Sequence, residues 1–102
     1  MAKRPNHSGL NLRLSVEVNN ERGSISAAYF YIRPGKSAEV REFANGMAFA
    51  DYDSQGRLLG IELLGPCEIA VMDKIAKKEP RPVKRFVHQS FPRGLELAGA
   101  AR

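Results

Sequence analysis

The chain has 102 residues, 43% of them hydrophobic, and a formal net charge of +5. This length allows one domain with tails, and no apolar run approaches the ~20 residues that a membrane-spanning helix needs. The single cysteine, Cys67, excludes an internal disulfide and fits a reducing compartment. Lys3 and Arg4 are not followed by an apolar segment, so we expect no signal peptide and a cytoplasmic location.

The positive charge is concentrated towards the C-terminus. Residues 1–11 contribute +2, residues 12–64 contribute −1 from six basic and seven acidic side chains, and residues 65–102 contribute +4 from eight basic and four acidic side chains. The predicted folded core is therefore nearly neutral. We divide the chain into a disordered N-terminal tail (1–10), a single α+β domain (11–79) and a basic C-terminal extension (80–102).

Alternating apolar residues predict an antiparallel sheet of about five strands. The run from Leu12 to Val18 alternates as a half-buried strand does. Residues 24–33 are apolar on both faces, which indicates a central strand. Three of their aromatic residues could line a ligand cleft together with Tyr52, but we favour core packing or subunit contact; the three are Tyr29, Phe30 and Tyr31. Residues 37–43 carry charges typical of an edge strand. Short turns make a meander the simplest topology.

The stretch from Gly46 to Leu64 predicts a β-hairpin. Its turn begins at Asp53, which suits the first position of a type I turn, and contains Gly56, which suits a left-handed residue. The resulting register opposes Asp53 to Arg57, Phe49 to Ile61 and Met47 to Leu63. Phe49 then lies at the centre of one face of the sheet, which we expect a helix to cover.

One helix is predicted after the hairpin. Pro66 fits a first helical position, apolar residues then recur at helical spacing, and Pro80 ends the pattern. We expect this helix over residues 66–77, packed across the sheet face that contains Phe49. The following segment has no clear period, although residues 83–89 could form a short helix.

One set of residues carries a family pattern. It consists of Ala27, Tyr31-Ile32-Arg33, Ala38-Glu39, Gly46, Asp51-Tyr52-Asp53 and Gly56-Arg57-Leu58-Leu59-Gly60-Ile61-Glu62. With these residues, the chain from about residue 16 to residue 64, about half of its length, resembles the bacterial domain of unknown function 2283 family. The resemblance implies a small antiparallel sheet domain with no established activity, sometimes found in settings that look like toxin–antitoxin pairs. Ala28 stands where the family usually has an acidic residue, so a function that needs that carboxylate is not expected.

Few side chains suggest catalysis or metal binding. Asp51 and Asp53 share a strand face and could bind a cation or act as acid and base, but Asp53 opens a turn and we favour a structural role. Cys67 could be a nucleophile at a helix N-terminus, yet the only histidines, His7 and His88, lie in the tails. We therefore predict no catalytic residue, no metal site and no cofactor, and we favour a protein that is not an enzyme.

The basic C-terminal segment suggests an interaction with phosphates. Residues 77–93 carry six basic side chains and one acidic side chain, with Phe86 and Phe91 among them. Basic groups bind phosphates and aromatic rings stack on bases. The alternatives are a solvated tail or a segment that docks onto an acidic partner. The candidate nucleic-acid-binding residues are Lys77, Lys78, Arg81, Lys84, Arg85 and Arg93.

We favour a non-enzymatic protein-interaction module, antitoxin-like or accessory, over a nucleic-acid-associated or regulatory protein. One helix covers one side of a sheet, and the bare side would be an apolar patch of the size that marks interfaces. We predict a homodimer through that side, with Tyr52 and Leu58 at the interface. The competing explanation is that Phe86, Val87 and Phe91 fold back over it. The expected partners are a second copy and an unidentified protein, with nucleic acid as the alternative and no membrane.

Overall fold

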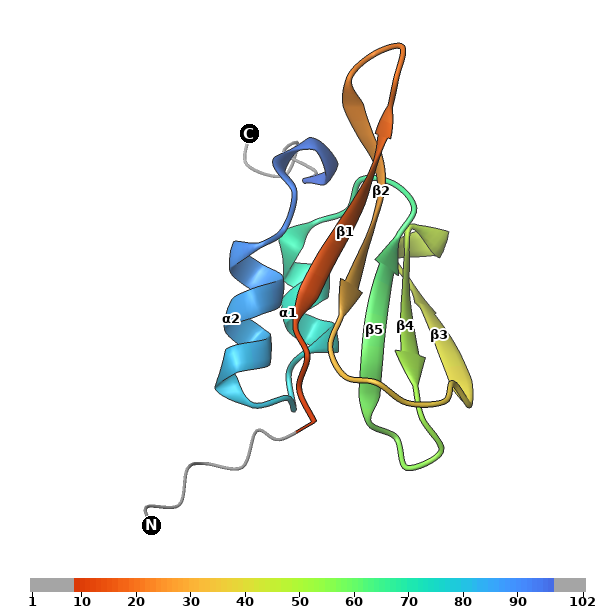
Figure 1. The fold of residues 1–102 in the computed structure, drawn as a ribbon, viewed down its shortest axis with the longest axis vertical. Helices are drawn as coiled ribbons and strands as arrows, with labels where there is room; N and C mark the ends of the chain where they lie inside the picture. The colour runs from red at the N-terminus through yellow and green to blue at the C-terminus, as the bar shows by residue number, and fades with distance from the viewer. Residues whose placement is uncertain (1–8, 97–102) are drawn as a thin grey trace.

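A computed structural model describes residues 9–96, in which five antiparallel strands form one sheet with two helices on one side (Figure 1). The strands are β1 (Arg13–Asn19), β2 (Ser24–Tyr31), β3 (Glu39–Phe43), β4 (Ala48–Tyr52) and β5 (Leu58–Leu63). The helices are α1 (Ile69–Ile75) and α2 (Arg81–Gln89), with short 3-10 turns η1 (Ala44–Gly46) and η2 (Arg93–Leu95). The α+β class is confirmed, with two α-helices instead of one. Most of the predicted N-terminal tail lies outside the described residues.

The strand order is β1-β2-β5-β4-β3, so the predicted meander is wrong. β2 pairs with β5, and the chain passes from β2 to the far edge of the sheet before β3 begins. The reason is burial. β5 is buried at five of its six positions, whereas β3 carries charged side chains that remain exposed. β5 therefore occupies the sheet interior beside β2, and β3 lies at an edge, as its charges indicate.

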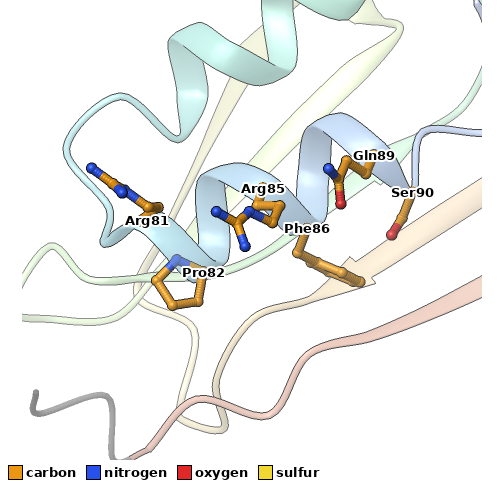
Figure 2. Close-up of a pocket in the computed structure, with 6 residues that line it drawn as sticks. All are labelled: Arg81, Pro82, Arg85, Phe86, Gln89 and Ser90. Carbon is orange, nitrogen blue, oxygen red and sulfur yellow. The ribbon is translucent and has the colours of Figure 1, made fainter. Parts of the chain in front are cut away.

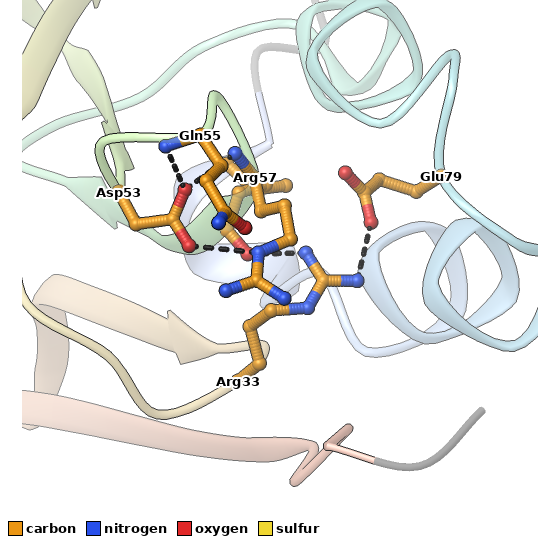
Figure 3. Close-up of polar contacts among 6 residues, drawn as sticks. Arg33, Asp53, Gln55, Arg57 and Glu79 are labelled. Carbon is orange, nitrogen blue, oxygen red and sulfur yellow. Dashed lines mark hydrogen bonds and ion pairs between the residues drawn. The ribbon is translucent and has the colours of Figure 1, made fainter.

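The hairpin turn at Asp53 forms as its chemistry predicts (Figure 3). The Asp53 carbonyl accepts a hydrogen bond from the Gly56 N–H at 3.0 Å, and Gly56 has a φ of +81°. Oδ1 of Asp53 accepts hydrogen bonds from the backbone N–H groups of Gln55 and Arg57 at 2.9 and 2.8 Å. The guanidinium of Arg57 also pairs with Oδ2 of Asp53 at 2.8 Å. Asp53 therefore stabilises the turn.

A β-bulge in β5 shifts the rest of the hairpin by one residue. The pairs on either side of the bulge are Asp51 with Gly60 and Tyr52 with Leu58. Leu59 is the extra residue, and Phe49 consequently lies opposite Glu62 instead of Ile61. Because alternate side chains point to opposite faces, Phe49 points away from the helices. The prediction that placed Phe49 under a helix is wrong, since turn chemistry determines the register only as far as the first bulge.

The core lies between the sheet and the two helices, which pack on the same face (Figure 1). Ala48 and Ala50 are small residues of β4 that face the helices and are fully buried. The Phe30 ring packs edge-on against Phe86 of α2, with 5.6 Å between ring centroids. The largest fully buried side chains are Phe30, Ile32, Leu58, Ile61, Leu63, Met72, Val83, Val87 and Leu95. Residues 81–95 thus share the sheet's core, which differs from the basic extension predicted after residue 79.

Arg33 joins the end of β2 to β5 and to the connection between the helices (Figure 3). Its Nη1 donates a hydrogen bond to the Leu58 carbonyl at 2.7 Å, and its Nη2 pairs with Oε1 of Glu79 at 3.0 Å. A guanidinium suits this position because it donates several hydrogen bonds in one plane. This ion pair neutralises Glu79, which is the one acidic residue between Lys74 and Arg93 in the sequence.

We expect the turn at Asp53 to give the fold a pH dependence in acid. Hydrogen bonds from the Arg57 and Gln55 backbone N–H groups, and the Arg57 guanidinium, lower the pKa of Asp53 below its ordinary value of 3.8. Ionised Asp53 therefore stabilises the fold fully above pH 3.8, and this contribution is lost as the pH falls through the lower pKa of the folded state. Asp53→Asn should melt below the wild type at neutral pH, and the gap should narrow in acid. A gap that is constant with pH in thermal melts would contradict this role.

Candidate functional site

The six basic residues identified in the sequence are all exposed, and five of them lie near one end of the helical layer. Arg81, Lys84 and Arg85 are spaced three or four residues apart, so they project from the same side of α2. Lys77 and Lys78 lie in the connection between α1 and α2, shortly before that helix begins. Arg93 begins η2, past the other end of α2, and is separate from them. We call the residues Lys77, Lys78, Arg81, Lys84 and Arg85 the basic helical surface.

The segment that contains the basic helical surface is strongly positive. Residues 74–93 contain seven basic side chains and one acidic side chain, a net +6. The acidic one is Glu79, which is paired with Arg33. His88 lies on the same side of α2 and contacts Asp73 of α1, with 2.9 Å between Nδ1 and Oδ1. The basic helical surface can therefore attract an anionic partner.

A shallow groove of about 490 Å³ lies beside α2 (Figure 2). In Figure 2 the ring of Phe86 projects from α2 towards the strands, which agrees with its contact with Phe30. The groove therefore combines an aromatic side chain with guanidinium, amide and hydroxyl donors, a set that binds anions and carries no nucleophile activated by a base. Its lining residues are Arg81, Pro82, Arg85, Phe86, Gln89 and Ser90.

The other face of the sheet carries no helix within residues 9–96 (Figure 1). The strand registers place three aromatic residues there, all half-buried, with Val40 exposed beside them. Four acidic side chains and Arg13 share the face, which gives its strand residues a net charge of −3. We call this surface the open sheet face. Its defining residues are Tyr29, Tyr31 and Phe49, with Glu17, Glu42, Asp51 and Glu62.

Tyr29 lies at the centre of the open sheet face. Its ring centroid is 4.5 Å from that of Tyr31, and the ring passes over Gly60, where an added Cβ would clash with the Tyr29 hydroxyl. Burial, and then the nearby carboxylate of Asp51, raises the pKa of Tyr29 to about 12. Asp51 also accepts a hydrogen bond from the Ser37 hydroxyl. Tyr29 is therefore protonated at neutral pH and suits a binding contact, not a general base.

Sequence reasoning missed most of the open sheet face. Residues 24–33 are apolar on both faces, so the pattern does not show which side of β2 stays uncovered, and Phe49 changed sides because of the bulge. One signal was available. A glycine inside a strand, here Gly60, often marks a bulge or a close approach of another group, and both occur at this position.

The interface predicted at Tyr52 and Leu58 needs correction. Both residues lie in the core beneath the helices, with exposed fractions of 9% for Tyr52 and 0% for Leu58. The bulge explains the error, because the one-residue shift in register puts both side chains on the sheet face that α1 and α2 cover. The C-terminal segment does fold onto the sheet, and Val87 and Phe91 are buried, but it covers the same face as α1. The homodimer itself stays a prediction.

The remaining candidates for chemistry are isolated. Cys67 is buried, and its burial, together with the charge of Glu68, raises the pKa of the thiol, which disfavours the reactive thiolate. Within residues 9–96, no three or more His, Cys, Asp and Glu side chains gather as metal ligands would. His7 lies outside the described residues. No helix in this part of the chain combines the length and the apolar character needed to cross a membrane.

The residues that carry the family resemblance lie mainly on neighbouring strands. Tyr31 of β2 pairs with Gly60 of β5, and Asp51 of β4 pairs with the same glycine from the other side. The resemblance thus falls on the sheet and its hairpin, and it stays a prediction. Comparisons with protein-family models, with curated proteins and with solved structures found no match.

Proposed function

We propose that this protein is a non-enzymatic interaction module whose open sheet face binds the basic surface of a partner protein. One observation carries the proposal: the face has an aromatic centre and a net charge of −3, and within residues 9–96 no helix lies on it. Aromatic side chains supply large contact areas at low cost in conformational entropy and are frequent among the residues that dominate binding energy.

The arrangement of the face supports a charged protein partner. Tyr29 and Tyr31 are half-buried against each other, and Arg13 lies 4.0 Å over the Tyr31 ring, so the aromatic centre is already ordered before binding. Side chains that are ordered beforehand lose less entropy when a partner docks. Glu42 and Glu62 lie on either side of Phe49 in the sheet. Such carboxylates favour a basic partner and disfavour nucleic acid, whose phosphates they repel.

Site-specific crosslinking in cells tests this proposal. A photo-crosslinking amino acid at position 49 should capture one basic protein, whereas the same group at Lys84, on the helical side, should not capture it. Glu62→Lys should abolish the crosslink from position 49, and Glu68→Lys, an identical charge change on the helical side, should leave it intact. Equal capture from both positions, or capture that Glu62→Lys does not change, would overturn the proposal.

A second candidate function is nucleic-acid binding through the basic helical surface. Three observations favour it: α2 orders Arg81, Lys84 and Arg85 on one side, the nearest carboxylate in sequence is occupied by Arg33, and the groove beside Phe86 offers an aromatic surface. Basic groups arranged on a helix can contact successive phosphates, and each contact releases bound counterions. The two proposed functions use opposite sides of the molecule and do not compete.

Binding to a labelled DNA duplex, measured by fluorescence anisotropy over a range of salt concentrations, tests the second function. Lys84→Glu/Arg85→Glu should weaken binding and reduce the slope of log K against log salt by about 2, because each phosphate contact contributes roughly 0.9. The matched control is Arg22→Glu/Lys36→Glu, which makes the same charge change at exposed positions in the loops that connect the strands. Equal losses in the two variants, or no binding by the wild type at low salt, would contradict this function.

A further inference from the structure

β1 is an edge strand whose apolar side chains lie on the helical side of the sheet, beyond the area that the helices cover. All seven of its residues are exposed, although every second one is apolar. Leu14, Val16 and Val18 have exposed fractions of 37%, 42% and 51%. Their neighbours in β2 differ sharply: Phe30, opposite Leu14, is fully buried beneath α2. The core therefore stops at β2, and β1 presents an apolar stripe together with a row of unpaired backbone groups.

The sequence of β1 is complementary to itself. When two copies run antiparallel with Ser15 opposite Ser15, Arg13 of each copy lies opposite Glu17 of the other, and Leu14 lies opposite Val16. Each two-fold pairing thus contains two opposite-charge pairs on one face and two apolar pairs on the other. Opposite charges directly across a strand pair stabilise it, and like charges destabilise it. Centring the pairing on Arg13 or Glu17 would place like charges opposite each other.

We infer that two copies of this chain join through their β1 strands, antiparallel about a two-fold axis at Ser15. The two five-stranded sheets become one continuous sheet, and the apolar stripes of Leu14 and Val16 meet on the helical side. An axis perpendicular to the sheet keeps both pairs of helices on one side and both open sheet faces on the other. This inference does not depend on the proposed function. The aromatic centre of the open sheet face and the basic helical surface stay uncovered, and only Arg13 and Glu17, at the edge of that face, take part in the pairing.

The geometry favours β1 over the opposite edge of the sheet. The bulge between these strands lies in β2, where Ser26 is the extra residue, so β1 itself remains regular. β3 is shorter, and two of its three charged side chains already pair with each other. Arg41 pairs with Glu39 at 2.8 Å and lies 4.5 Å from the Tyr52 ring. Pairing at β3 would require these contacts to rearrange.

Sedimentation of the full chain at micromolar concentration tests the inference. The wild type should show twice the chain mass of 11.3 kDa. Arg13→Glu and Glu17→Arg should each return it towards monomer, because each places like charges opposite one another twice. The double variant Arg13→Glu/Glu17→Arg should restore the dimer. A monomeric wild type, or a dimer that the single variants leave unchanged, would overturn the inference.

Two further comparisons keep the test independent of any effect on folding. Val16→Asp on β1 should abolish the dimer, whereas Val40→Asp, also an exposed valine on an edge strand, should not. Ser15→Cys should form a disulfide-linked dimer under mild oxidation, because residues directly opposite in an antiparallel pair lie within disulfide range. Glu17→Cys should not, since it faces Arg13 of the other copy. Equal crosslinking from positions 15 and 17 would overturn the register. Loss of the dimer in both valine variants would overturn the assignment of the interface to β1.

Discussion

Phe30→Ala should lower the free energy of unfolding by about 3–5 kcal/mol, the usual range for emptying a buried phenylalanine site. Phe30 is fully buried near the end of β2 and packs against Phe86 of α2. Its removal therefore opens a cavity between the sheet and the helical layer. A small domain has about 5–15 kcal/mol of stability in total, so the loss should be clear in urea denaturation.

The matched control is Phe49→Ala. The two phenylalanines are identical in chemistry, but Phe49 is half-buried on the open sheet face, where partial exposure leaves no closed cavity. We expect a loss of about 1 kcal/mol, in the usual range for point variants. If Phe49→Ala were as destabilising as Phe30→Ala, the bulge at Leu59 and the face assigned to Phe49 would both be wrong.

A chain that ends at residue 79 should fail to fold cooperatively. The truncation removes α2, η2 and the segment that joins them, and with them four buried apolar side chains that complete the core: Val83, Val87, Phe91 and Leu95. Losing one large buried aliphatic side chain typically costs about 2–5 kcal/mol, so losing all four approaches the whole stability of a small domain. Near-ultraviolet circular dichroism should lose its fixed signal. A truncated chain that melts cooperatively would show instead that the sheet and α1 fold alone.

A pair of point variants on α2 separates packing from charge. Val87→Asp places a carboxylate in the core and should destabilise the full chain by several kcal/mol. Lys84→Asp introduces the same side chain on the exposed side of the same helix and should leave the melting temperature nearly unchanged. Equal effects of the two substitutions would mean that α2 is oriented differently.

The features that the sequence predicted correctly depend on local chemistry. The turn at Asp53 and Gly56 needs only hydrogen bonds between residues close in the chain, and it forms as expected. The alternation from Leu12 to Val18 is likewise a local pattern, and it becomes β1. The helix predicted over residues 66–77 forms as the shorter α1, Ile69–Ile75. The exposed basic residues of the candidate nucleic-acid surface were also recognisable, because charge itself keeps them on the surface.

The features that sequence reasoning missed are decided by competition for burial between distant segments. Whether β3 or β5 pairs with β2 depends on which strand buries more apolar surface, and β5 does. α2 appears basic along the chain, but Val83 and Val87 fill the core beside Phe30, which only the folded sheet provides.

By itself, therefore, the sequence of this protein determined the strands, the Asp53 turn, the helix after Pro66 and the charged surface residues, because each depends on neighbours in the chain. Tertiary structure alone decided the strand order, the bulge at Leu59, and hence which residues form the open sheet face. The physical reason is the two-residue period of a strand, in which a shift of one position exchanges its faces. That shift placed Tyr52 and Leu58 in the core and put Phe49 on the open sheet face.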